Sequence, residues 1–323
     1  MKIILPGGSG QAGALLARAF RQDGHSVVVL GREAGTEPLT SGIRQVAWDA
    51  RTLGDWAEEL DGADVVINLA GRSVDCRHTP ANQRLILESR INSTRVVGQA
   101  IAACSHPPAL WLQASAATLY THHTERAQDE TSGLIGGSEA DLPAKWRAMV
   151  EVVKAWEGAQ NDADTPHTRR VALRISLLLS PDPGGVFAVL LRLVRLGLGG
   201  TAGTGRQYVS WIHDRDFVNA LRFIIEHPEL EGPVNLAAPE PLPNAEFMRI
   251  LRRAWGMPIG LPAPALLIEL GSLLLRTESK LVLKSRRVIP GRLLDSGFRF
   301  SFPDWQTAAC DLCQRARVRT GEH

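Results

Sequence analysis

The amino terminus reads Lys2-Ile3-Ile4-Leu5-Pro6-Gly7-Gly8-Ser9-Gly10-Gln11-Ala12-Gly13, and this stretch decides the fold. Residues 2–5 are typical of a short buried strand, and residues 10–22 have the apolar periodicity of a helix. Between them the glycines form both Gly-x-Gly-x-x-Gly and Gly-x-x-Gly-x-x-Gly. Such glycines allow a tight turn and a close approach of the backbone to a diphosphate, which the helix N-terminus then binds. The stretch therefore predicts a dinucleotide site formed by Gly7, Gly8, Ser9, Gly10, Gln11, Ala12 and Gly13.

The end of the second predicted strand indicates which dinucleotide binds. This strand ends in Leu30-Gly31-Arg32, where an NAD-selective site has an acidic residue for the ribose hydroxyls. An arginine at this place pairs with a 2′-phosphate, so Arg32 favours NADP(H) over NAD(H). The alternative is that Arg32 is a solvated charge and that Glu33 contacts the ribose.

Apolar runs alternate with helical patterns through the first two thirds of the chain. The predicted strands are 2–5, 26–30, 44–48, 64–69, 109–113 and 168–175. The predicted helices between them are 10–22, 52–60, 80–103 and 143–160. Nearly continuous apolar strands that alternate with helices predict an α/β fold with a doubly wound parallel sheet, the Rossmann architecture.

The pattern changes after residue 180, where Pro181-Asp182-Pro183-Gly184-Gly185 predicts a loop. A helix at 186–198 follows, then strands at 207–212 and 233–236 that we expect to return to the sheet, then mostly helices. We expect an NADP-binding domain at 1–180, with 205–236 returning to it. Residues 181–204 and 237–323 are expected to form a smaller, mainly helical substrate lobe.

Composition excludes several classes of protein. The chain has 323 residues, of which 44% are hydrophobic and 22% charged, and its net charge is +2. This balance excludes intrinsic disorder and gives no electrostatic reason to bind nucleic acid or an anionic membrane. Four cysteines are too few for a disulfide framework, and the apolar stretch at 261–275 is too short to span a bilayer. With no signal peptide visible, we expect a reduced, cytoplasmic protein.

Several later motifs accompany the glycine turn. They are Gly197-Leu198-Gly199-Gly200, Gly205-Arg206-Gln207, Ser210-Trp211-Ile212-His213, Gly232-Pro233-Val234-Asn235, Pro243-Asn244-Ala245-Glu246-Phe247 and Pro290-Gly291-Arg292-Leu293-Leu294. Over nearly the whole chain they resemble the atypical, epimerase-like family of the extended short-chain dehydrogenases/reductases, in the NAD-dependent epimerase/dehydratase superfamily, with its C-terminal domain of unknown function. The resemblance implies hydride transfer between NADP(H) and a small carbonyl or hydroxyl substrate. Relatives often form homodimers through the helices that correspond to 80–103 and 143–160.

The resemblance also implies cofactor contacts outside the glycine turn. Asp49 stands where the superfamily contacts adenine. The loop after the fourth strand, which lies against the cofactor, is formed by Asn68, Leu69, Ala70 and Gly71. Pro6 departs from the threonine usual before the glycines, which should alter only local hydrogen bonding.

The acid–base pair of the superfamily is missing. That pair is Tyr-x-x-x-Lys on a helix, in which the lysine lowers the pKa of the tyrosine toward neutrality. The chain has two tyrosines, Tyr120 and Tyr208, and no Tyr-x-x-x-Lys. Aligned on Ala155-Trp156-Glu157, the pair falls at Met149 and Val153, which cannot transfer a proton. This departure puts the usual mechanism in doubt.

Four residues are candidates to replace the pair. The segment after the fifth strand normally supplies a catalytic serine or threonine. An ungapped alignment places Ala116 at the position of that residue, so Ser115 or Thr118 must take its role. Tyr120, from the same loop, is either the acid or a residue that packs against the cofactor. Lys154 follows the missing lysine by one residue and points about 100° away from it around the helix. It is either a cofactor contact or a surface charge.

The other reactive side chains favour structural roles. We expect His213 to begin a helix, since Asp214 and Asp216 suit a helix N-terminus. Cys76 and His78 are either a nucleophilic pair at the substrate cleft or side chains that point apart, as neighbours in an extended loop normally do. Cys310-x-x-Cys313 is either a zinc or redox site or two helical cysteines, and the sequence has no second pair. The arginine clusters either hold an anion or form a solvated basic face; they are Arg286, Arg287, Arg292, Arg315, Arg317 and Arg319.

Together these observations favour an NADP(H)-dependent oxidoreductase or epimerase-like enzyme with a small-molecule substrate. Hydrolase, metalloprotease and nucleoside triphosphatase motifs do not occur in the sequence. The rival hypothesis is an NADPH-binding sensor or scaffold without turnover. This hypothesis is supported by the combination of a complete glycine turn and a missing acid–base pair.

Overall fold

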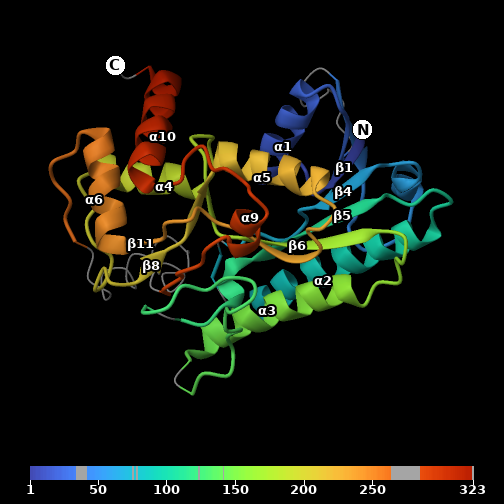
Figure 1. The fold of residues 1–323 in the computed structure, drawn as a ribbon, viewed down its shortest axis with the longest axis horizontal. Coiled ribbons are helices and arrows are strands. Elements are labelled where there is room, and N and C mark those ends of the chain that lie inside the picture. The colour runs from blue at the N-terminus through green and yellow to red at the C-terminus, as the bar shows by residue number, and fades with distance from the viewer. Residues whose placement is uncertain are drawn as a thin grey trace.

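Seven parallel strands form the central sheet, in the order β10-β6-β5-β4-β1-β2-β3 (Figure 1). They are β1 Lys2–Pro6, β2 Ser26–Gly31, β3 Ile43–Ala47, β4 Val65–Asn68, β5 Leu110–Ala116, β6 Arg169–Ile175 and β10 Gly232–Leu236. The order 3-2-1-4-5-6 is that of the doubly wound fold, in which ligands bind where the strand order reverses, here between β1 and β4. The predicted fold class is confirmed.

The computed structural model describes residues 1–33, 42–74, 76–77, 79–122, 124–140, 142–262 and 284–321. His78 and most of the apolar stretch at 261–275 lie outside the described residues. Within the described ranges, no helix combines the length and the apolar character needed to cross a membrane.

Helices cover both faces of the sheet (Figure 1). On one face lie α1 Gln11–Gln22 and α5 Asp214–Glu226, and on the other α2 Pro80–Ala103 and α3 Ala144–Asn161. Alternate residues of β1 point to opposite faces. Ile3 therefore packs in a core with Phe20 of α1 and Phe217 of α5, whereas Ile4 packs in a second core with Val97 of α2. These two cores explain why the strands are apolar on both faces.

The C-terminal lobe is mainly helical, as predicted. Within the described residues its helices are α4 Val186–Arg195, α6 Asn244–Trp255, the short α9 Gly291–Asp295 and α10 Trp305–Thr320. Trp305 lies in the core of this lobe, where its ring stacks on Phe247 at 4.1 Å and its Nε1 donates to the Phe247 carbonyl at 2.8 Å.

The segment 207–212 does not join the main sheet, so this prediction was wrong. β8 Tyr208–Val209 pairs with β11 Leu242–Pro243, and β9 Trp211–His213 pairs with β7 Leu177–Leu179. Ser210 divides the segment, because its hydroxyl donates to the Arg286 carbonyl at 2.6 Å and accepts from the Val288 amide at 2.8 Å. The helix predicted at 52–60 is a 3₁₀ helix, η1 Asp55–Leu60.

Candidate functional site

The glycine turn connects β1 to α1, and its backbone conformation requires glycine at two positions, Gly7 and Gly13. Gly7 has a φ of +75°, and a Cβ there would lie 2.6 Å from the Cα of Ala70. A Cβ on Gly13 would lie 2.3 Å from the Cα of Gly8. The first helical turn of α1 therefore sits directly on the strand–helix turn, and the backbone of the turn is the surface offered to a ligand.

The N-terminus of α1 suits an anion. Gly10 is the N-cap residue and makes no side-chain cap, and the first turn contains no acidic residue. Ser9 and Gly10 are exposed, while Gln11 and Ala12 are half-buried. Amides at an uncapped helix N-terminus carry partial positive charge and point toward the turn. The residues at this turn therefore fit the diphosphate of a dinucleotide.

The loop after β4 forms the second wall of this turn. The Leu69 amide donates to the Pro6 carbonyl at 2.8 Å, so the loop is attached to the strand that leads into the glycines. Asn68 is fully buried, its Oδ1 accepts from the Ala70 amide and its Nδ2 donates to Gln113. Asn68 therefore shapes the loop, in which Ala70 is buried and Gly71 is exposed.

The two residues predicted to contact the adenosine half lie at the edge formed by β2 and β3. Arg32 and Glu33 directly follow β2 and are both exposed. The carboxylate of Asp49, also exposed, accepts from the Thr52 amide and hydroxyl and from the Arg51 amide. These hydrogen bonds lower the pKa of Asp49 and hold it in a local turn. The side chain of Asp49 is therefore already engaged, whereas Arg32 lies in solvent.

Two of the three positions where the resemblance places proton-transfer groups lie in an apolar cluster, which does not include Met149. Val153 and Val150 of α3 pack against Leu119, in the 3₁₀ turn η2 Ala117–Leu119, and against Ala116 at the end of β5. Ala116 and Val153 are the positions where the resemblance places the catalytic serine or threonine and the lysine. The structure thus brings these two positions together, with methyl groups in place of polar ones.

Ser115 belongs to a buried polar network beneath this cluster. Its hydroxyl donates to Glu157 Oε1 at 2.5 Å, and Arg174 holds the same carboxylate with two hydrogen bonds of 2.9 Å. Ser115, Arg174 and Asn235 pair across β5, β6 and β10, so they share one face of the sheet. The network is therefore built by the strand register and completed by α3.

Tyr120 extends the network and is enclosed by it. Only 2% of the side chain is exposed, and its hydroxyl donates to Asn235 Oδ1 and accepts from Arg174, both at 2.9 Å. Burial raises the pKa of Tyr120, although Arg174 and Asn235 oppose the shift. The backbone amide of Asn235 in turn donates to Glu130 Oε1 at 2.7 Å, and burial raises the pKa of the Glu130 carboxyl. The phenolate form of Tyr120 is thus disfavoured.

Thr118 is half-buried, and its backbone contacts a lysine from the C-terminal lobe. Lys284 is 3% exposed and donates from Nζ to the Thr118 carbonyl at 3.0 Å. Burial and the neighbouring Arg286 lower the pKa of Lys284 to about 8, and Glu139 opposes the shift. A cation therefore lies against the turn that follows β5.

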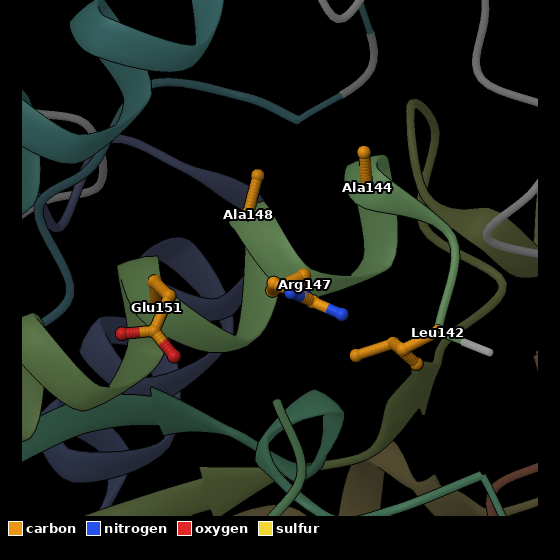
Figure 2. A pocket seen from close by; sticks show the side chains of 5 residues that line it. All are labelled: Leu142, Ala144, Arg147, Ala148 and Glu151. Atoms are coloured by element: carbon orange, nitrogen blue, oxygen red, sulfur yellow. The ribbon is translucent and has the colours of Figure 1, made fainter. Parts of the chain in front are cut away.

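Lys154 and a surface pocket lie on the exposed side of α3. Lys154 pairs with Glu151 at 3.0 Å. Figure 2 shows the pocket, which is lined by Leu142, Ala144, Arg147, Ala148 and Glu151. Its volume is about 460 Å³. Ser115, Thr118 and Tyr120 do not line it. This pocket is a helix-surface hollow apart from the predicted catalytic residues.

Of the other reactive side chains, His213 has the predicted place. It is the N-cap residue of α5, where Nδ1 accepts from the Arg215 amide, and Nε2 contacts Asp311 of α10 at 3.0 Å. Cys310 is exposed and Cys313 is buried on α10. The predicted basic clusters are divided by the fold: Arg315 binds Asp214, whereas Arg292 donates to backbone carbonyls.

Sequence reasoning missed Glu157, Arg174, Asn235 and Lys284. One signal was present in the sequence, because Arg174 interrupts the apolar run of β6 that begins at Val171. A charged side chain at such a position requires a buried partner. The partners themselves are 17 to 61 residues away from it along the chain and come together only through the sheet.

Known proteins resemble this chain over nearly its whole length. Residues 3–237 match the model of the NAD dependent epimerase/dehydratase family, and residues 263–312 match a domain of unknown function, DUF1731. The chain belongs to the NAD-dependent epimerase/dehydratase family. The predicted resemblance is thereby confirmed.

Three known proteins show how similar the relatives are. The epimerase family protein YfhF of Bacillus subtilis is 31% identical over 312 residues, which are 97% of this chain and 98% of YfhF. Human epimerase family protein SDR39U1, solved with NADPH, superposes with a TM-score of 0.82 at 28% identity, over 97% of this chain and 99% of that one. A nucleoside-diphosphate sugar epimerase from Corynebacterium glutamicum has a TM-score of 0.74 at 26% identity, over 97% of this chain and 58% of that one.

Proposed function

We propose that this chain is an NADP(H)-dependent, epimerase-like oxidoreductase that acts on a small carbonyl or hydroxyl substrate without a Tyr-x-x-x-Lys pair. The observation that carries the proposal is the glycine turn with the uncapped N-terminus of α1, followed at the end of β2 by an exposed Arg32. The human relative solved with NADPH supports the choice of cofactor.

In this proposal the chain's residues bind the cofactor in four places. The turn from Gly7 to Gly13 binds the diphosphate, Arg32 pairs with the 2′-phosphate and the segment at Asp49 lies beside the adenine. The loop from Asn68 to Gly71 lies against the rest of the cofactor. Lys154 is either a further cofactor contact or a surface charge paired with Glu151. NADPH, when bound, supplies a hydride from its nicotinamide ring.

Domain roles follow from the same proposal. Residues 1–180 would bind NADP(H), together with the part of 205–236 that packs on or joins the sheet, which is α5 and β10. Residues 181–204 and 237–323 would supply the substrate side of the site. The support for this division is the core around Trp305, which is distinct from the two cores that cover the sheet, although Leu179 and Trp211 also contribute to it.

Proton exchange with the substrate oxygen is assigned to the segment after β5. The Ser115 hydroxyl donates to Glu157, so its oxygen remains able to accept a proton from a substrate hydroxyl while its own proton passes to that carboxylate. The Thr118 hydroxyl is the less buried alternative. Because burial raises its pKa, Tyr120 could act only as an acid from its protonated form, and its hydroxyl also accepts a hydrogen bond from Arg174. Ser115 is thus the favoured proton-transfer group, with Thr118 and Tyr120 as the other two candidates.

Cofactor choice is tested by thermal unfolding with NADPH and with NADH. A ligand at one hundred times its Kd stabilises the folded state by about 2.7 kcal/mol, so NADPH should raise the Tm clearly and NADH should not. Arg32→Ala should weaken NADPH binding roughly 10- to 100-fold, because a charge-assisted hydrogen bond is lost. Arg44→Ala is the matched control. It removes an exposed arginine of β3 that pairs with Glu59 of η1. No Tm shift with either nucleotide would refute the proposed cofactor site.

A second function is favoured by the apolar cluster: an NADPH-binding sensor or scaffold without turnover. Ala116 and Val153 place methyl groups where the superfamily has its proton-transfer groups. A panel of carbonyl compounds distinguishes the two functions through substrate-dependent oxidation of NADPH. Turnover that Ser115→Ala or Tyr120→Phe abolishes supports the enzyme, whereas tight NADPH binding with no turnover across the panel supports the sensor.

The remaining proposals concern location and assembly. We propose a cytoplasmic protein that takes a small-molecule substrate and forms a homodimer through α2 and α3. The support for the dimer is that the N-terminal half of α3 leaves Ala144, Arg147 and Glu151 exposed beside the hollow of Figure 2. Light scattering after gel filtration should give twice the 35.1 kDa chain mass. A monomer at micromolar concentration would contradict the dimer.

A further inference from the structure

The loop between β7 and α4 lies directly against the start of α1. The side-chain amide of Gln11 covers Gly185 so closely that a Cβ on Gly185 would lie 2.1 Å from Gln11 Nε2. The same nitrogen donates to the Asp182 carbonyl at 3.4 Å. The first residue of α1, which belongs to the glycine turn, thus packs on the backbone of residues 182–185.

Asp182 holds this loop through its side chain as well. Its carboxylate accepts hydrogen bonds from Arg18 of α1 and from Arg319 in the last turn of α10. Arg18 and Gln11 are seven residues apart and therefore lie on the same face of α1. Asp182 contacts α1 at two points, and it connects this helix to the C-terminal lobe.

The preceding part of the loop is attached to α10 as well. The Asp182 amide donates to the Ser180 hydroxyl at 3.3 Å, and that hydroxyl donates to Asp214 at 2.8 Å. Arg315 of α10 holds Asp214 with hydrogen bonds of 2.8 and 2.6 Å. Two arginines of α10, four residues apart, therefore fix the loop that borders Gln11.

We propose that Asp182 is a positioning residue of the cofactor site: bound by Arg18 and Arg319, it holds residues 180–185 against Gln11 and thereby slows the release of NADPH. The inference rests on the proposed cofactor. A diphosphate at the N-terminus of α1 lies next to Gln11, so a loop packed on Gln11 restricts one side of its exit. Exposed ion pairs are individually weak, and we expect release to become about three- to tenfold faster when the connection is broken.

Two variants that change the charge in opposite directions distinguish the positioning role of Asp182 from a long-range electrostatic effect. Asp182→Asn removes a negative charge near the diphosphate and by electrostatics alone should slow release. Arg319→Met removes a positive charge and by electrostatics alone should hasten it. If Asp182 acts by holding the loop, both variants release NADPH faster in stopped-flow fluorescence with excess NADP⁺ as the competitor. Opposite changes, or no change, would overturn the proposal.

Asp23→Asn is the matched control. Asp23 is the C-cap residue of α1, at the far end of the helix from the glycine turn, and Arg222 of α5 binds it with two hydrogen bonds of 2.8 Å. The variant therefore also breaks an ion pair between α1 and another helix. Release of NADPH from Asp23→Asn should equal release from the wild type. An equal acceleration in the control would overturn the proposal.

Hydrogen exchange gives a readout without cofactor. The amides of residue 182 and of residues 184–189 should exchange faster in both Asp182→Asn and Arg319→Met than in the wild type, and not in Asp23→Asn. Unchanged exchange would overturn the proposed role of Asp182 even if NADPH binds. A wild type that binds no NADPH would instead overturn the proposed function, and the role of Asp182 in cofactor release with it.

Discussion

The glycine turn and the turn after β5 lie at the carboxyl ends of two strands that flank β4, yet they are built in opposite ways. The glycine turn is made of backbone: Gly7 and Gly13 have no room for a Cβ, and the N-terminus of α1 is left uncapped. The turn after β5 is made of side chains, with Ala116, Leu119 and Val153 packed together. Anion binding therefore has its groups in place, whereas proton transfer has lost those that the superfamily uses.

The difference teaches that binding and chemistry are separable in this fold. A diphosphate site needs only free amides and space, which the backbone supplies wherever glycines permit. Proton transfer needs particular side chains with suitable pKa values, and a few substitutions remove them. What remains polar near β5 is the enclosed network of Ser115, Glu157, Arg174 and Tyr120, which stabilises the sheet and α3 whether or not it also moves a proton.

The largest expected effect comes from filling the glycine turn. Gly13→Ala places a methyl group 2.3 Å from the Cα of Gly8, so the turn must open and NADPH binding should be lost. Gly158→Ala on α3 is the control, because nothing lies within 4 Å of its Cβ, and it should add up to about 1 kcal/mol of stability. Isothermal titration with NADPH and urea unfolding check both variants. Wild-type affinity in Gly13→Ala would show that the turn is not the binding surface.

The next largest effect tests whether the network under β5 is structural. Glu157→Gln leaves Arg174 buried without its carboxylate, and the free energy of unfolding should fall by about 3–5 kcal/mol. NADPH affinity of the folded variant should stay near that of the wild type. Glu151→Gln, which breaks an exposed ion pair on the same helix, should cost less than about 1 kcal/mol. If the two variants are equally stable, the network does not support the fold.

A smaller effect follows from the pKa of Lys284. Burial lowers it from 10.5 to about 8, so between these values the unfolded chain binds more protons and stability rises with pH. Below pH 8 both states are protonated and the full burial penalty applies. The stability of the wild type relative to Lys284→Met should therefore increase by about 2 kcal/mol from pH 7 to pH 10. Urea unfolding at both pH values measures this increase, with Lys154→Met as the control for loss of an exposed lysine. A constant difference would mean that the Lys284 amine is solvated.

The smallest effect sharpens the role of Tyr120. Tyr120→Phe removes one hydrogen bond each from Arg174 and Asn235 and keeps the ring in the core, so stability should fall by about 1–2 kcal/mol. NADPH affinity should not change, because the hydroxyl is enclosed by protein groups. Thermal unfolding and NADPH titration measure the two quantities. A large loss of NADPH affinity would place the Tyr120 hydroxyl at the cofactor.

Much of the fold could be predicted because its signals are local. The apolar strands, the glycine turn and the His213 helix start depend on residues within a few positions of each other. The error at 207–212 arose where Ser210 binds a segment 76 and 78 residues further along the chain, at Arg286 and Val288. Local patterns carry no information about such partners.

The sequence by itself determined the parallel sheet, the glycine turn that begins α1 and the absence of a Tyr-x-x-x-Lys pair, since each depends on residue types at short spacings. Only the tertiary structure decided which polar groups meet the end of β5 and the segment that follows it. It brings Glu157 to Ser115, Arg174 to Tyr120 and Lys284 to Thr118, across 42, 54 and 166 residues. The physical reason is that strand register and helix packing, rather than neighbouring residues, set which side chains share a buried face.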